Sequence, residues 1–407
     1  MFDHLQIYER RERLLVGLAD LALWPLKLVP ARRPRPLRRV LLLRLERIGD
    51  LLMVLEAIRL VRQALPDAEI ELAVGSWNAP LARLLPEITR VDVVDAPWLA
   101  RGTSASWAQL SDRTREWRDR YDLVINFEPD IRSNALAWLA RAPRRAGYST
   151  GGGGALLTEA HAYDPSRHVA GNARELVART LDLDLAAAPA PYASSRLSLP
   201  PAAFTPADAL LGTANHPRIG VHVSGGRESK QWHPDRFAAV ARQLALAHHA
   251  TIVLTGTNDD RPLVDQVRRN LTDVAVVDAC GALDLVALAG LLQRLDLFIS
   301  SDTGPMHLAA AVGTPIVALF GPSDPRRYGP IAERHTVIRV DLWCSPCGQV
   351  RLPPERCRGH VPDCMDAVTV ERVVAAATAL IEGQRAEGKG QKTEDKGQRT
   401  ESTGQKA

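Results

Sequence analysis

The sequence predicts an α/β protein of two doubly wound domains, each a parallel sheet covered by helices. The chain has 407 residues, more than the roughly 250–300 at which one hydrophobic core stops growing. Short apolar runs alternate with amphipathic stretches of helical period, a rhythm typical of parallel α/β sheets. A segment rich in Pro, Ala and Ser at 186–206 interrupts this rhythm once. It therefore indicates a boundary between two domains.

The first half contains three expected strands, at 40–45, 70–74 and 123–127, with helices at 51–64 and around 107–120. The second half repeats the pattern with eight elements. In chain order they are strand 219–223, helix 234–247, strand 251–255, helices 263–270 and 285–293, strand 297–300, helix 306–312 and strand 316–320. Ligands of such sheets bind beyond the carboxyl ends of the strands, so a ligand site is expected in the loops that follow the strands.

These elements predict a division of the chain into five parts. They are an amphipathic, basic N-terminal segment at 1–38, a first Rossmann-like domain at 39–190, a linker at 191–215, a second such domain at 216–382 with a cysteine-rich loop at 344–364, and a tail at 383–407. The tail repeats a Gly-Gln-Lys/Arg motif every seven residues without an apolar position. Such a composition cannot offset its ordering entropy, so we expect disorder and no part in the chemistry.

The formal charge of +4 is concentrated at the ends of the chain. Residues 1–40 carry nine Lys/Arg against four Asp/Glu and residues 383–407 carry six against four, which leaves the rest at −3. A nucleic-acid partner is therefore not expected, because the folded part offers no basic stripe for phosphates. The 46% hydrophobic and 24% charged residues are ordinary for a globular protein.

The first 24 residues are typical of an amphipathic helix, with Arg11 intruding on its apolar face. That face comprises Ile7, Leu14, Leu15, Leu18, Leu21 and Ala22, with Trp24 near its edge. Prolines end the helix and five arginines follow between 32 and 39. Two interpretations fit: peripheral contact with an anionic membrane surface, or a helix packed on the body with a solvated linker. No apolar run reaches 18 residues, no signal-cleavage pattern follows, and five cysteines suit a reducing cytoplasm.

The most informative loop is the run 302–307 (DTGPMH), between an expected strand and an expected helix. Pro305 suits a first helical turn and Gly304 permits close backbone approach to a ligand. Free amides, the helix dipole, Thr303 and His307 would together hold a phosphate or diphosphate. The alternative is a structural helix cap by Asp302.

Three other loops follow strands. In the first, Ser224, Gly225 and Gly226 could cradle an oxyanion with Lys230 placing positive charge against it, although a Gly-Gly turn alone is often only a turn. In the second, Asp260 could accept ribose hydroxyls or cap the following helix. In the third, Asp50 follows Gly49 at a helix start, as a cap or as an acid–base group facing the other domain.

Together these stretches resemble glycosyltransferase family 9, the lipopolysaccharide heptosyltransferases and their relatives. The resemblance covers about residues 39–382. It rests on 43–50 (LRLERIGD), 229–237 (SKQWHPDRF), 302–307 (DTGPMH) and 319–325 (LFGPSDP), in the family's order. It implies a GT-B fold, two Rossmann-like domains facing across a cleft, with a lipid-linked glycan acceptor on the first domain and a nucleotide-sugar donor on the second.

The resemblance also implies roles for residues in an inverting, metal-independent transfer. Asp50 matches the family's general base, and Lys230, with the Gly225 and Gly226 amides, matches the clamp on the donor diphosphate. The expected contacts to the donor sugar and phosphates are Asp302, Thr303, Gly304 and His307; Asp260 matches a ribose-binding carboxylate and Leu283 an apolar contact to adenine. No cofactor is required, because a lysine, amides and a helix end replace a metal.

Two departures from the family pattern concern substrates. In 126–133 (NFEPDIRS), Glu128 stands where the family commonly has an aspartate after the strand. Heptose from ADP-heptose is the leading expectation for the donor, but the run GPMH is the version of the broader family rather than that of the enteric heptosyltransferases, which leaves the donor sugar open. The alternatives are a sugar-nucleotide epimerase or hydrolase, which would turn over without an acceptor, and a nucleotide-sugar-binding protein without catalysis.

Four of the five cysteines cluster, at Cys344, Cys347, Cys357 and Cys364. Four thiolates with one CxxC pair meet the needs of tetrahedral structural zinc, and reduced thiols or local disulfides are the alternatives. The fifth, Cys280, is expected to be a packed core residue.

Overall fold

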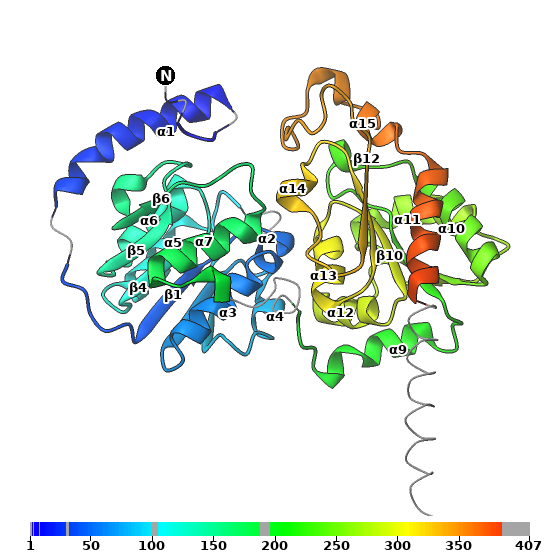
Figure 1. The fold of residues 1–407 in the computed structure, drawn as a ribbon, viewed down its shortest axis with the longest axis horizontal. Helices are drawn as coiled ribbons and strands as arrows, with labels where there is room; N and C mark the ends of the chain where they lie inside the picture. Colours follow the sequence, from blue (N-terminus) through cyan, green and yellow to red (C-terminus); the bar gives the residue numbers. More distant parts are fainter. Residues whose placement is uncertain are drawn as a thin grey trace, which may run out of the picture. The chain divides into compact units, whose positions relative to one another are not determined.

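The protein is described here by a computed structural model covering residues 2, 4–7, 9–29, 32–99, 105–187 and 196–384. It divides into two compact units, Met1–Pro200 and Pro201–Ala407 (Figure 1). Beyond Gln384, the tail that was predicted to be disordered lies outside the described residues. None of the described helices is long and apolar enough to cross a membrane.

The described residues of the first unit form a six-stranded sheet, ordered β3-β2-β1-β4-β5-β6, in which every pair is parallel. Its strands are β1 (Arg39–Leu43), β2 (Glu69–Val74), β3 (Arg90–Val93), β4 (Leu123–Asn126), β5 (Arg144–Tyr148) and β6 (Glu159–His161). The predicted strands correspond to β1, β2 and β4. The other three were not predicted.

Helices connect and cover this sheet. They are α2 (Ile48–Leu52), α3 (Leu55–Ala64), α4 (Ala79–Ala82), α5 (Trp107–Trp117), α6 (Ile131–Leu139) and α7 (Val169–Leu181), with 3-10 turns η2 (Gly154–Leu156) and η3 (Leu185–Ala187). Alternate β1 residues Leu41 and Leu43 pack with Trp117 of α5 and Leu136 of α6 in one apolar core. The Leu, Ile and Val side chains of the central strands β1 and β4 lie on both faces of the sheet and are fully buried, as parallel strands between helices require.

The second unit has the same topology, with the described strands ordered β12-β11-β10-β7-β8-β9. They are β7 (Arg218–His222), β8 (Thr251–Thr255), β9 (Val276–Asp278), β10 (Leu297–Ser301), β11 (Ile316–Phe320) and β12 (His335–Arg339), all paired in parallel. The strands predicted in this half correspond to β7, β8, β10 and β11. The two edge strands, β9 and β12, were not predicted.

The helices of the second unit include all those predicted. They are η4 (Pro201–Ala203), α9 (Thr205–Leu211), η5 (Glu228–Lys230), α10 (Pro234–His248), η6 (Asn258–Asp260), α11 (Arg261–Arg269), α12 (Leu285–Gln293), α13 (Gly304–Val312), α14 (Pro325–Tyr328), η7 (Glu355–Cys357), α15 (Asp363–Asp366) and a helix whose described part spans 370–384. Val221 of β7 shares a buried core with Phe237 of α10, Val264 of α11 and Val373. Cys280 is buried in the same core, as predicted.

The predicted linker at 191–215 is only partly a linker. Residues 188–195 lie outside the described residues, but α9 packs on α12 within the second unit. Arg294 pairs with Asp208 of α9 at 2.9 Å and lies 4.5 Å from the ring centroid of Phe204. The apolar contacts of Ala207 and Leu211, both buried, explain why this Ala-rich stretch folds.

The N-terminal segment forms α1 (Arg10–Leu23) and the 3-10 turn η1 (Trp24–Leu28). One face of α1 packs on the first unit: Asp20 Oδ1 accepts a hydrogen bond from Gly153 N at 2.5 Å, and Val16 lies against Gly152. The predicted apolar face points the other way, with Leu15 and Leu21 exposed by 67% and 66%. The helix therefore packs on the body and also exposes its leucines.

Candidate active site

Each sheet has a topological switch point, where chain connections leave two neighbouring strands in opposite directions. In the first unit it lies between β1 and β4, and in the second between β7 and β10. Loops at the carboxyl ends of such strand pairs form the usual ligand crevice of an open α/β sheet. Asp50 follows β1, Lys230 follows β7 and Asp302 follows β10, so the predicted chemical groups lie at these points.

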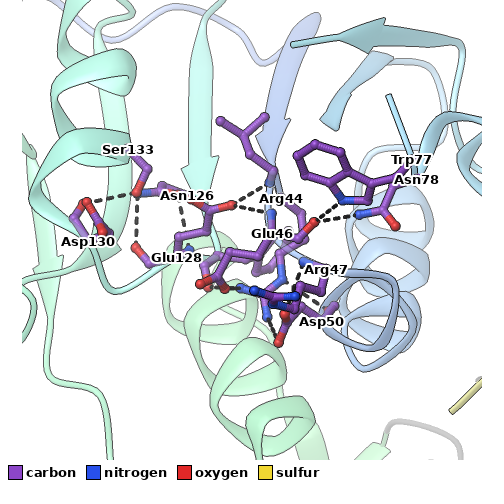
Figure 2. Close-up of polar contacts among 12 residues, drawn as sticks. Arg44, Glu46, Arg47, Asp50, Trp77, Asn78, Asn126, Glu128, Asp130 and Ser133 are labelled. Atoms are coloured by element: carbon purple, nitrogen blue, oxygen red, sulfur yellow. Dashed lines mark hydrogen bonds and ion pairs between the residues drawn. The ribbon is translucent and has the colours of Figure 1, made fainter. Parts of the chain in front are cut away.

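Asp50 lies in the first turn of α2 and is both a cap and an ion-pair partner (Figure 2). Its Oδ2 accepts a hydrogen bond from Arg47 N at 3.1 Å, and its Oδ1 lies 3.4 Å from Arg44 Nη2. Its side chain keeps 23% of its surface exposed. A carboxylate fixed on one side and open on the other is suited to accept a proton from a bound hydroxyl.

Arg44 was not predicted as a site residue. Its guanidinium, 2% exposed, also donates from Nε to the Asp50 carbonyl oxygen at 3.0 Å and from Nη1 to the Phe127 carbonyl oxygen at 2.9 Å. Burial works against its charge, but the nearby carboxylates of Asp50, Glu46 and Glu128 outweigh it and raise the pKa of Arg44. The signal in the sequence was a single arginine within the apolar run 41–45.

The second unit joins Lys230 and Asp302 across its switch point. Lys230 Nζ donates to the Asp302 carbonyl oxygen and lies 3.2 Å from Asp302 Oδ2. His307 Nε2 is 3.8 Å from Asp302 Oδ1. Burial alone would raise the pKa of Asp302, but Lys230, His307 and Ser323 hold it well below its usual range. The site thus carries a fixed carboxylate and a partly buried ammonium group.

Asp302 does not cap α13. The N-cap residue is Thr303, whose side chain makes no cap hydrogen bond and instead lies with its Oγ1 3.0 Å from Ser300 Oγ. Gly304 begins the helix and Pro305 occupies its first turn, as predicted. No side chain therefore caps the amides at the start of α13, and His307 lies one turn into the helix.

The glycine turn after β7 differs from the open cradle that we expected. Gly225 N donates to Gln231 Oε1 at 2.8 Å and Gly226 N to Ser224 Oγ at 3.2 Å, so both amides already have acceptors. A Cβ on Gly225 would come within 2.6 Å of the Gln231 backbone nitrogen. Gly225 is thus needed for close packing of the turn against the Lys230 segment.

In the loop after β8, Asp260 caps the turn η6, whereas as the N-cap residue of the following helix α11 its side chain makes no cap hydrogen bond. Asp260 Oδ2 accepts from Thr257 N and Thr257 Oγ1, both at 2.8 Å. Burial would raise the pKa of Asp260, but these bonds and one with Ser224 lower it. Leu283 lies half-buried just before α12, in a loop tied to the β8 loop by the bond from Gly281 N to the Gly256 carbonyl oxygen at 2.8 Å.

The four clustered cysteines form no disulfide and line one small cavity together with Ser229 and Pro322. Burial and the other three thiol groups raise the pKa of Cys364 to about 11. Within the described ranges, no three His, Cys, Asp or Glu side chains are arranged to hold a metal ion. Ser229 Oγ donates to the Val350 carbonyl oxygen at 3.2 Å, which ties this loop to the turn carrying Lys230.

Comparisons with known proteins agree with this topology. The family model described as glycosyltransferase family 9 (heptosyltransferase) matches residues 114–354. Lipooligosaccharide heptosyltransferase 2 of Haemophilus influenzae is 25% identical over 309 residues, covering 72% of this chain and 86% of that protein. Lipopolysaccharide heptosyltransferase 1 of Pseudomonas aeruginosa is 26% identical over 325 residues, covering 76% and 86%.

Two solved structures share the fold. The glycosyl transferase family 9 protein of Veillonella parvula has a TM-score of 0.71 at 25% identity, covering 87% of this chain and 99% of that one. ADP-heptose lps heptosyltransferase II of E. coli has a TM-score of 0.69 at 20% identity, covering 85% and 99%. The predicted GT-B fold class is thereby confirmed. Since the family model spans more than half of the chain, the protein belongs to glycosyltransferase family 9 and is a glycosyltransferase.

Proposed function

We propose that this glycosyltransferase moves a heptose from ADP-heptose to a lipopolysaccharide-core or related envelope glycan, with inversion and without a catalytic metal. The names of its relatives, lipooligosaccharide and lipopolysaccharide heptosyltransferases, support the sugar and the acceptor class. The observation that carries the chemistry is that Asp50 and Lys230 each lie at the switch point of their own sheet, partly exposed and held by an oppositely charged partner.

In the proposed reaction Asp50 removes the proton from the acceptor hydroxyl as its oxygen attacks the anomeric carbon. The bond from that carbon to the diphosphate oxygen breaks, and the diphosphate leaves with the electron pair. Lys230 and the start of α13 stabilise its growing negative charge. Thr303, Gly304 and His307 are proposed to contact the donor sugar and phosphates, with Ser224, Asp260 and Leu283 toward the nucleoside. Because Gly225 and Gly226 already bond to protein acceptors, Lys230 carries more of the proposed clamp than their amides.

The test is a thermal-shift panel of ADP-, GDP-, UDP- and dTDP-sugars, followed by transfer assays. A donor at 100 times its Kd stabilises the protein by about 2.7 kcal/mol, so ADP-heptose is expected to raise the melting temperature most. A shift with another donor and none with ADP-heptose would contradict the proposed sugar. Turnover of the donor without an acceptor would instead indicate a hydrolase or epimerase.

We further propose that the N-terminal segment holds the enzyme peripherally on the cytoplasmic face of the inner membrane. The exposed stripe of α1 and η1 is long and apolar; its members are Leu14, Leu15, Leu18, Leu21, Trp24, Leu28 and Val29. Lys27 and the arginines that follow supply positive charge for anionic lipids. The body-facing side of α1 contacts the loop after β5, and Glu12 lies 3.9 Å from Arg132 at the start of α6. The exposed stripe therefore lies near the carboxyl ends of the strands of the first sheet, the same side that carries Asp50. A lipid-linked acceptor would be presented there.

We predict that a Leu15→Glu/Leu21→Glu variant loses more than 10-fold of its partitioning onto anionic vesicles. Burying one leucine side chain contributes about 1.5–3 kcal/mol, and both are two-thirds exposed, so folding is spared. The measurement is cosedimentation with phosphatidylglycerol-containing vesicles. Leu246→Glu, at an exposed leucine of α10, is the matched control and should sediment like the parent. Equal sedimentation of the double variant would contradict membrane contact by this stripe.

We propose that the four-cysteine cluster takes up structural zinc, with no part in transfer, although its described side chains are not arranged around a metal ion. The shared cavity and the CxxC pair support this, since thiolates are preferred zinc ligands. We expect about one zinc per chain by elemental analysis, and a Cys344→Ser/Cys347→Ser variant to lose it and to melt at a lower temperature. A metal-free protein whose melting temperature is unaffected by chelator would contradict the proposal.

A further inference from the structure

Glu128 joins the two loops at the switch point of the first unit. It lies two residues beyond the end of β4 and is 1% exposed. Its Oε1 accepts hydrogen bonds from the backbone nitrogens of Leu45 and Glu46, the latter at 3.1 Å, in the loop after β1 (Figure 2). One side chain from the β4–α6 loop therefore holds the backbone of the β1–α2 loop.

The same backbone is held from its other side. The carbonyl oxygen of Glu46 accepts hydrogen bonds from Trp77 Nε1 at 2.6 Å and from Asn78 Nδ2 at 2.9 Å. Glu46 is thus fixed at both its nitrogen and its carbonyl oxygen. Arg47, the next residue, donates its backbone N–H to Asp50. The position of Asp50 therefore depends on contacts that begin at Glu128.

Glu128 is itself held by a buried amide network. Its nitrogen donates to Asn126 Oδ1 at 3.1 Å, and Asn126 Nδ2 donates to Ser133 Oγ at 3.0 Å and Asn134 Oδ1 at 2.8 Å. Asn134 in turn donates to the carbonyl oxygens of Tyr148 and Gly152. All of these polar side chains are fully buried. The carboxyl group is therefore supported by β4, α6 and the loop after β5.

The charges around Glu128 do not balance if every group is ionised. Arg44 lies 3.2 Å from Glu46 and 3.4 Å from Asp50 and also acts on Glu128, so one guanidinium faces three carboxyl groups. Asp130, also near, is neutralised by Arg132 at 2.5 Å. Burial and the Glu46 carboxylate raise the pKa of Glu128 to about 8 against the opposing effects of Arg44 and the Leu45 amide. Whether charged or not, the carboxyl group of Glu128 keeps an oxygen that accepts the two amides.

We propose that Glu128 is a positioning residue for transfer: its carboxyl group holds the β1–α2 loop in the arrangement that presents Asp50 to the acceptor hydroxyl. This inference rests on the proposed role of Asp50 as the base. Glu128 itself does not take the proton of the hydroxyl, because its carboxyl group is buried and occupied by backbone amides.

The test compares Glu128→Gln with Glu128→Ala in steady-state transfer at pH 7. Gln keeps an oxygen for the two amides, so its kcat at pH 7 is expected within about 3-fold of the parent. Ala removes the acceptor, so its kcat is expected to fall at least 30-fold with the KM for donor unchanged.

Other results would overturn the positioning role, either alone or together with the proposed base. A Gln variant as inactive as Asp50→Asn would overturn the positioning role, because the ionisable group itself would then be needed. The Gln result decides this even if the Ala variant fails to fold. An inactive Asp50→Asn variant beside a fully active Glu128→Ala variant overturns the positioning role alone. A fully active Asp50→Asn variant overturns the proposed base and this inference with it.

Discussion

Replacing Asp50 by Asn is expected to lower kcat by about three orders of magnitude and to leave the affinity for the nucleotide donor unchanged. General acid–base groups contribute typically 10²–10⁴-fold, and an amide accepts no proton at neutral pH. Asn has nearly the same shape, and its oxygen can still accept the Arg47 amide that caps α2. The loop should therefore keep its position, and the loss should fall on the chemical step.

The measurements are single-turnover transfer rates and donor affinity by calorimetry. Glu46→Gln is the matched comparison, because it removes a negative charge from the same guanidinium, at 3.2 Å, without touching the α2 cap. We expect that variant to stay within about 10-fold of the parent. If Asp50→Asn remained active and Glu46→Gln did not, the base would have been assigned to the wrong carboxylate.

The sequence predicted the central strands of both sheets because these are short, fully apolar runs such as Leu41–Leu43 and Ile316–Phe320. It did not predict the edge strands β3, β6, β9 and β12, and for a physical reason. Edge strands are partly exposed and need no apolar run, and the sequences RVDV, EAH, VVD and HTVIR carry charged or polar residues. The sequence also did not predict β5, because its first two residues are arginines whose side chains bond to neighbouring polar groups.

The candidate site was predictable where one loop carries the information, as for Asp50, Lys230 and the run 302–307. The hydrogen bond between Glu128 and the β1–α2 loop was not predictable. It joins residues 83 positions apart that become neighbours only when β4 pairs with β1. The same is true of Lys230 and Asp302, 72 positions apart, which meet when β10 pairs with β7. Strand order, which spacing along the chain does not encode, decides both contacts.

Replacing Lys230 by Met is expected to reduce kcat/KM at least 100-fold and to weaken donor binding. An ammonium aimed at the diphosphate stabilises the charge that develops on the leaving group, and removing one such donor costs about 10²–10³ in rate. The variant should also be less stable. The two side chains are 17% and 11% exposed, and breaking a buried ion pair costs about 3–5 kcal/mol because the other charge is left uncompensated.

The dependence of stability on pH shows whether the stability lost in Lys230→Met comes from the unpaired Asp302 carboxylate. In the parent the pKa of Asp302 is depressed, so its contribution to stability is present above the ordinary carboxyl pKa of about 3.9 and is lost as the pH falls through the lower folded value. Without Lys230 the burial that raises the pKa of Asp302 is less opposed. The single variant should therefore lose stability relative to the parent as the pH rises from 4 to 7, which thermal melts across that range would measure.

The double variant Lys230→Met/Asp302→Asn decides whether Lys230 serves the donor or only Asp302. Without the buried carboxylate the uncompensated charge is gone, so the double variant should regain most of the melting temperature that the single variant loses. It should not regain transfer or donor affinity, because neither Met nor Asn offers a cation to a diphosphate. Recovery of both stability and activity would mean that Lys230 only neutralises Asp302, and the start of α13 with His307 would then have to hold the donor phosphates.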